Sequence, residues 1–125
     1  MDITTNLVPF WHEPEGQDSV EEGKRVRFKL RPLTQPQVND LFSTFELVGH
    51  DKRKPTAATW YAAGCMGLDG ALSAASNVIE NLAVDGKPAR WPRDKNVVPH
   101  EMVSSCGVRL CLDSWGEDAG EAEKN

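Results

Sequence analysis

The feature of the sequence that most constrains the fold is an alternating segment at residues 24–34, KRVRFKLRPLT. Three apolar side chains alternate there with four basic ones, which is the period-two pattern of a half-buried β-strand. The apolar residues are Val26, Phe28 and Leu30, and the basic ones are Arg25, Arg27, Lys29 and Arg31. Pro32 has no backbone N–H and ends the strand, and Thr34 is of a residue type that caps helices. The segment therefore predicts a strand followed at once by a helix.

A second strand is predicted just before this one. Residues 7–12, LVPFWH, are apolar and aromatic. Pro9 lacks the N–H that a central strand would donate, which places this segment at the edge of a sheet. The loop at residues 13–23 is rich in carboxylates and would join the two strands as a hairpin with an acidic tip.

The first helix is predicted to begin after Thr34, with Pro36 in its first turn, where a missing N–H costs nothing. Apolar residues follow at helical spacing, and they are Val38, Leu41, Phe42 and Phe45. They would lie on one face and cover the apolar side of the alternating strand. Gly49 is predicted to end this helix as its C-terminal cap.

A second helix is predicted at residues 57–76, with Thr56 as its N-terminal cap. The segment is rich in alanine and glycine, which allows close approach of another helix or of another subunit. Each glycine weakens a helix by about 1 kcal/mol relative to alanine, so a break near residues 67–70 is a second interpretation.

A hairpin and a last helix follow. Asp85 and Gly86 stand between two extended segments, and this dipeptide favours a type I′ turn with positive φ at both positions. From about residue 98 the apolar residues follow one helical face, with Pro99 in the first turn, so a helix ending near Trp115 is predicted.

These elements together predict an α+β fold. A small antiparallel sheet, built from the N-terminal hairpin and a later hairpin, would be packed by about three helices. A chain of 125 residues fits a single domain, which we place at residues 1–116. Residues 117–125 are predicted to form an acidic, flexible tail.

Composition argues against several classes of function. The net charge of -5 argues against nucleic acid as the main partner, because polyanions are usually bound by a basic surface. The apolar stretch at residues 57–72 contains Thr59 and Asp69 and is too short and interrupted to cross a membrane. The N-terminus lacks the positive flank and apolar run of a secretory signal, so we expect a cytoplasmic protein with reduced cysteines.

No catalytic, cofactor or metal site is predicted, and the chain is expected not to be an enzyme. The histidines lie in separate segments, which leaves His100 with Cys106 and Cys111 as the one conceivable metal set. The two cysteines stand about 140° apart around a helix, and we interpret them as small buried apolar side chains. No base stands close in sequence to activate a thiol.

Two candidate partner-binding features remain. The first is the basic side of the alternating strand, formed by Arg25, Arg27, Lys29 and Arg31. Such a face either recruits an acidic or helical partner or is simply solvated. The second is Trp91, which stands at the end of a predicted hairpin and is either an exposed interface anchor or a core residue.

Two segments resemble the tail assembly chaperones of long-tailed bacteriophages. The first is VRFKLRPLT at residues 26–34, which is similar to an early strand of that family that ends in Leu-Arg-Pro-Leu-Thr before a helix. The second is residues 78–91, with the turn VDGKP, followed by a final helix. Together they cover roughly half of the chain.

The resemblance implies a non-enzymatic helper that acts in the host cytoplasm during infection. Its partners would be the tape-measure protein, which it keeps soluble, and the tail tube subunits that polymerise around it. A homo-oligomer, in which several copies coat one long client, would also be consistent with this role.

Two other functions are carried as alternatives. The chain could be a structural virion component, such as a tail-completion or head–tail connector protein, whose strands add to a neighbouring sheet. It could also be a small phage inhibitor that presents its acidic surface to a host factor.

Overall fold

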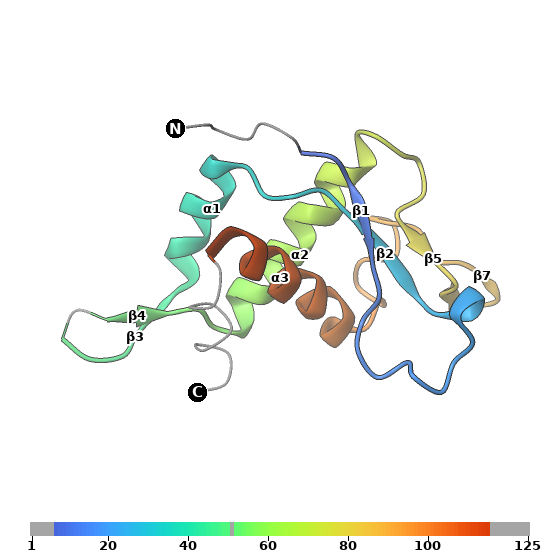
Figure 1. Ribbon diagram of the computed structural model, residues 1–125, viewed down its shortest axis with the longest axis horizontal. Coiled ribbons are helices and arrows are strands. Elements are labelled where there is room, and N and C mark those ends of the chain that lie inside the picture. Colours follow the sequence, from blue (N-terminus) through green and yellow to red (C-terminus); the bar gives the residue numbers. More distant parts are fainter. Residues whose placement is uncertain (1–6, 51, 116–125) are drawn as a thin grey trace.

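The computed structural model describes residues 7–50 and 52–115, with backbone alone at residues 114 and 115. In this part of the chain three α-helices combine with three small antiparallel sheets (Figure 1). The fold is therefore α+β, as predicted. The predicted tail at residues 117–125 lies outside the described residues.

The alternating segment forms the middle strand of the main sheet. Strand β2 (Arg27–Leu30) lies between β1 (Phe10–His12) and β5 (Ile79–Glu80), and both neighbours are antiparallel to it. The predicted N-terminal hairpin with β1 at the edge is thus confirmed. Its connecting loop contains a short 3-10 turn, η1 (Glu22–Lys24). Strand β5, from the extended segment predicted at residues 78–84, forms the other edge of the sheet.

The first helix is shorter than predicted. Helix α1 (Gln35–Leu41) begins at Thr34, whose side chain and that of Gln37 form a reciprocal cap. It gives way to a 3-10 turn, η2 (Phe42–Thr44), instead of continuing to Gly49. The reason is local, because the Thr44 hydroxyl donates to the Leu41 carbonyl at 2.6 Å and draws the chain out of the helix.

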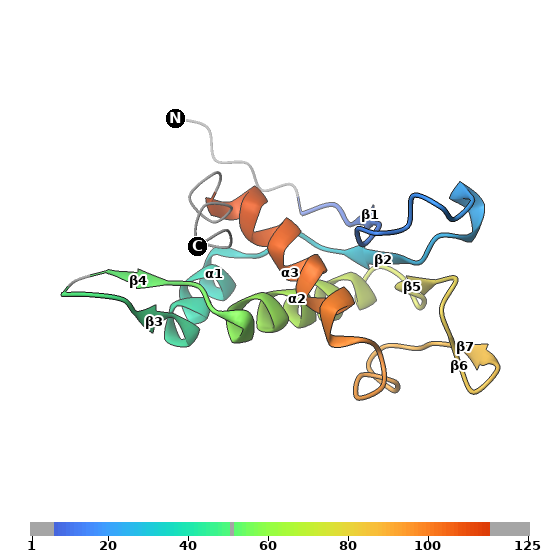
Figure 2. The ribbon, with the colours of Figure 1, turned by 90° about the horizontal axis from the view of Figure 1, so that it is seen from below.

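A two-stranded ribbon replaces the predicted end of this helix. Strand β3 (Glu46–Leu47) pairs with β4 (Arg53–Lys54), and Gly49 has a φ of 126° in the connection between them. We call residues 46–54 the arm. Figures 1 and 2 show it projecting away from the rest of the molecule.

Helix α2 (Ala57–Leu72) is continuous, so the predicted break at residues 67–70 is wrong. The helix begins where Thr59 accepts a hydrogen bond from the Thr56 N–H, and it ends four residues before the predicted end at residue 76. Its glycines are compensated by packing. Gly64 lies against Val103, and Gly67 lies against Leu30 and Leu110.

Helix α3 (His100–Trp115) crosses α2, and the two helices lie side by side in both views (Figures 1 and 2). The predicted apolar face of α3 is confirmed in its fully buried members, which are Val103, Cys106, Leu110 and Cys111. The apolar side of β2 is covered mainly by α2, not by α1 as predicted. Phe28 and Leu30 have no exposed surface there, whereas Phe42 of the predicted α1 face is largely exposed.

The predicted later hairpin is present, but it forms a two-stranded sheet of its own instead of joining the main sheet. Strands β6 (Ala83–Val84) and β7 (Lys87–Pro88) pair through a turn in which Asp85 and Gly86 have φ values of 52° and 78°. Positive φ at both positions is what a type I′ turn requires. Among residues 7–50 and 52–115, no helix is long and apolar enough to span a bilayer.

Candidate functional site

The basic side of β2 is largely engaged within the molecule. Arg25 donates to the Val20 carbonyl at 2.9 Å, and its guanidinium lies 3.5 Å from a Glu13 carboxylate oxygen. Arg27 forms an ion pair with Glu80, the residue opposite it on β5. These contacts hold the sheet and its loop together, so the two arginines act first as structural residues.

Two further members of the basic set also have neighbours in the fold. The Lys29 ammonium lies 5.7 Å from the centre of the Trp11 ring, within range of a cation–π contact. Arg31 does not point to solvent with the others. Its backbone N–H donates to Gly67 at 3.0 Å, and its guanidinium occupies the space that a side chain at Gly70 would need. Arg31 therefore packs against α2, and its part in partner binding stays a prediction.

Trp91 is a core residue. Only 5% of its surface is exposed, and its indole N–H donates to Asp69 of α2 at 2.7 Å. This bond connects the segment after β7 to the last turn of α2. The interpretation of Trp91 as an exposed interface anchor is wrong, because its side chain is buried in the core and bonded to α2.

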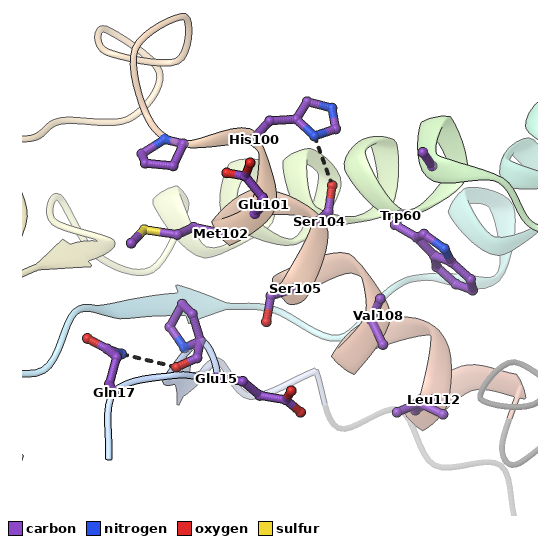
Figure 3. Close-up of a pocket in the computed structure, with 13 residues that line it drawn as sticks. Glu15, Gln17, Trp60, His100, Glu101, Met102, Ser104, Ser105, Val108 and Leu112 are labelled. Atoms are coloured by element: carbon purple, nitrogen blue, oxygen red, sulfur yellow. Dashed lines mark hydrogen bonds between the residues drawn. The ribbon is translucent and has the colours of Figure 1, made fainter. Parts of the chain in front are cut away.

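A cleft opens between α3, the start of α2 and the β1–β2 loop (Figure 3). We call it the cleft. Its volume is about 660 Å³. Apolar atoms dominate its surface, and its lining includes Trp60, Met102, Val108, Leu112, Glu15 and Glu101.

The loop wall of the cleft is held in place by Gln17. The Gln17 amide donates to the carbonyls of Pro14 and Val26 at 3.2 and 2.9 Å, and it accepts from the Val26 N–H at 2.7 Å. These bonds fasten the loop to the start of β2. Glu15 is thereby presented at the rim on a fixed piece of backbone, and the cleft has a preformed wall.

The helical wall is ordered by polar contacts around His100. Its ring stacks on Tyr61 of α2 with 4.4 Å between ring centres, and its Nδ1 lies 3.3 Å from the Ser104 hydroxyl (Figure 3). One turn away, the Ser105 hydroxyl lies 3.0 Å from Nε2 of His12 on β1. Burial lowers the pKa of His12, and the nearby Arg109 guanidinium lowers it further.

The cleft is suited to binding. Its formally charged lining residues, Glu15 and Glu101, are both carboxylates. An apolar ligand face flanked by cations would match this surface. No group of three or more metal-ligating side chains occurs among the described residues.

Cys106 and Cys111 are buried, as predicted, and Cys65 is buried too. Cys65, Cys106 and Cys111 are free thiols in the interior. Burial raises the pKa of Cys106 and of Cys111 to about 12. A raised pKa disfavours the thiolate, which is the reactive form of a cysteine.

Sequence reasoning missed the cleft because its residues come from three separate parts of the chain. Tertiary packing brings Glu15, Trp60 and Glu101 to one cleft, and no local sequence pattern predicts this proximity. The arm was missed as well, although Gly49 followed by a polar segment is a usable turn signal.

No protein-family model, curated protein or solved structure shows a significant match to this chain.

Proposed function

We propose that this protein is a phage tail assembly chaperone that holds an amphipathic helix of the tape-measure protein and assists tail tube assembly in the host cytoplasm. The observation that carries the proposal is the cleft. Its lining residues on α3 run from His100 to Leu112, most of its surface is apolar, and its charged residues are the carboxylates Glu15 and Glu101. Such grooves accept the apolar face of a partner helix.

The arrangement of the floor supports a helical client. Val108 and Leu112 lie one turn apart on α3 and leave apolar surface accessible, and Trp60 of α2 also lines the cleft. A client helix with apolar residues at positions i, i+4 and i+7 could place them along this floor. Basic residues beside that stripe would then face Glu15 and Glu101.

The test is co-expression of the chain with the neighbouring tape-measure and tail tube genes, followed by affinity capture. We expect the tape-measure protein to be retained by the wild-type chain and to aggregate without it. Leu112→Glu, on the exposed edge of the cleft, should release the client. Val97→Glu is the matched control, because Val97 is also exposed but does not line the cleft. Equal capture by both variants would contradict the proposed site.

A structural virion component is the second candidate function. The arm favours it, because Leu47 and Val48 expose apolar surface on a short ribbon that could join a neighbouring subunit. Mass spectrometry of purified particles separates the two functions. A chaperone is absent from finished virions, whereas a tail-completion or connector protein is present in fixed stoichiometry.

A further inference from the structure

The end of the arm is apolar and basic, and none of the described residues around it buries its apolar side chains. Leu47 and Val48 are 60% and 43% exposed, although both are large apolar residues. Lys52 and Arg53 stand beside them on the returning strand and are exposed too. The arm has three cations, Lys52, Arg53 and Lys54, against two carboxylates. These are Glu46, which lies opposite Lys54 in the ribbon, and Asp51, whose placement lies outside the described residues.

The cleft has the complementary properties. Leu112, on its edge, is itself one of the exposed large apolar residues of the chain. The charges that line the cleft are negative, and the charges on the described end of the arm are positive. An apolar pair flanked by cations would therefore meet an apolar floor flanked by Glu15 and Glu101.

The positions of the two surfaces on the chain allow an exchange between two copies. Strand β4 ends at Lys54, and Ala57, only three residues later, already lines the cleft. From this junction the arm extends to one side, and the N-terminal half of α3 with the β1–β2 loop lies on the other (Figure 1). A two-fold axis near the junction would place each arm over the cleft of the other copy, which is a closed, self-complementary arrangement.

We propose that the free protein forms a two-fold dimer in which the arm of each copy occupies the cleft of the other. Leu47 and Val48 lie on the apolar floor, and Lys52 and Arg53 face Glu15 and Glu101. The dimer uses the surface that the proposed function assigns to the client, so the arm covers that surface when no client is bound. Formation of the dimer does not depend on the client, so the dimer and the binding of the client can be tested separately.

The experiment is sedimentation equilibrium of the full chain and of two double variants. The arm variant is Lys52→Glu with Arg53→Glu, and the cleft variant is Glu15→Lys with Glu101→Lys. We expect the wild-type mass to rise with concentration from 13.8 kDa toward twice that value. Each double variant should dissociate at least about tenfold more readily, because like charges then face one another. Lys87→Glu and Asp18→Lys are matched controls, because both residues are exposed and belong to neither surface.

Mixing the two variants gives the sharpest result. In a mixed dimer the reversed arm meets the reversed cleft, and the unchanged arm meets the unchanged cleft, so equimolar mixing should restore association. If a reversed variant does not fold, Leu47→Ser with Val48→Ser tests the same contact at exposed positions. A wild-type chain that remains at 13.8 kDa up to about 1 mM overturns the proposal, as does a mixture that fails to associate. Because no client is present, loss of client binding in the capture experiment leaves this result unaffected.

Discussion

Gly107 of α3 packs its Cα directly against the backbone carbonyl of Trp60 on α2. A Cβ at Gly107 would lie 1.7 Å from that oxygen, far inside any permitted contact. Gly64 makes the reverse contact, since its Cβ would lie 2.1 Å from the carbonyl oxygen of Val103. The two helices therefore cross with backbone against backbone. This crossing fixes the start of α2 relative to α3, and hence the shape of the cleft between them.

Gly107→Ala is expected to destabilise the protein, although the same change at a free helical position is favourable. Alanine would gain up to about 1 kcal/mol from helix propensity, but overpacking at this crossing costs about 1–3 kcal/mol or more. Gly23→Ala is the control, because no atom lies within 4 Å of a Cβ there. Denaturant unfolding should show a loss at Gly107 and little change at Gly23. Equal stability of both variants would mean that the helices do not cross so closely.

Phe28→Ala and Leu30→Ala should each remove a large part of the stability. Both side chains have no exposed surface, and truncation of such residues costs about 2–5 kcal/mol. Lys29→Ala, between them on the opposite side of β2, should change the free energy of unfolding by about 1 kcal/mol or less. The measurement is the midpoint of urea unfolding for all three variants. Similar midpoints for Phe28→Ala and Lys29→Ala would contradict the orientation of β2, in which Phe28 faces the core and Lys29 does not.

The elements that the sequence predicts well are those whose signals are local. The Thr34 cap, the alternation around Phe28 and the Asp85-Gly86 turn each depend on a few neighbouring residues, and each is present in the structure. The errors concern competition between local and distant contacts. The glycines of α2 predict a weak helix, but Gly64 gains a backbone contact with α3 that no local rule contains.

The candidate site was harder to predict than the fold. The charges of Arg25 and Arg27 are evident from the sequence, but their partners, Glu13 and Glu80, are identified only by the folded sheet. The sequence therefore overstated the basic face as an interface. The cleft was not predicted either, because its walls are far apart in the sequence and only tertiary packing brings them close.

The three cysteines should be unreactive in the folded protein. Burial raises the pKa of Cys65 as well as those of Cys106 and Cys111, so little thiolate is present at about pH 8. A chromogenic thiol reagent should react slowly with the native chain and fully after unfolding. The rate in the native state would then report local opening of the helix pair. Rapid labelling of all three thiols without denaturant would contradict this buried arrangement.

The stability of the hairpin against α3 should depend on pH through His12. Burial, together with Arg109, holds the pKa of His12 below its ordinary value of 6.5, although Glu15, Asp113 and Glu13 act in the opposite direction. The native state therefore favours the neutral ring, and the unfolded chain takes up a proton first as the pH falls. The contribution is fully present above about pH 6.5 and is lost as the pH falls through the lowered native pKa.

His12→Gln retains a group that can bond to Ser105 but does not titrate. We expect the wild-type free energy of unfolding to fall more steeply than that of the variant between about pH 7 and pH 5, measured by urea unfolding. Parallel curves for the two proteins would show that the ring titrates freely in the folded state.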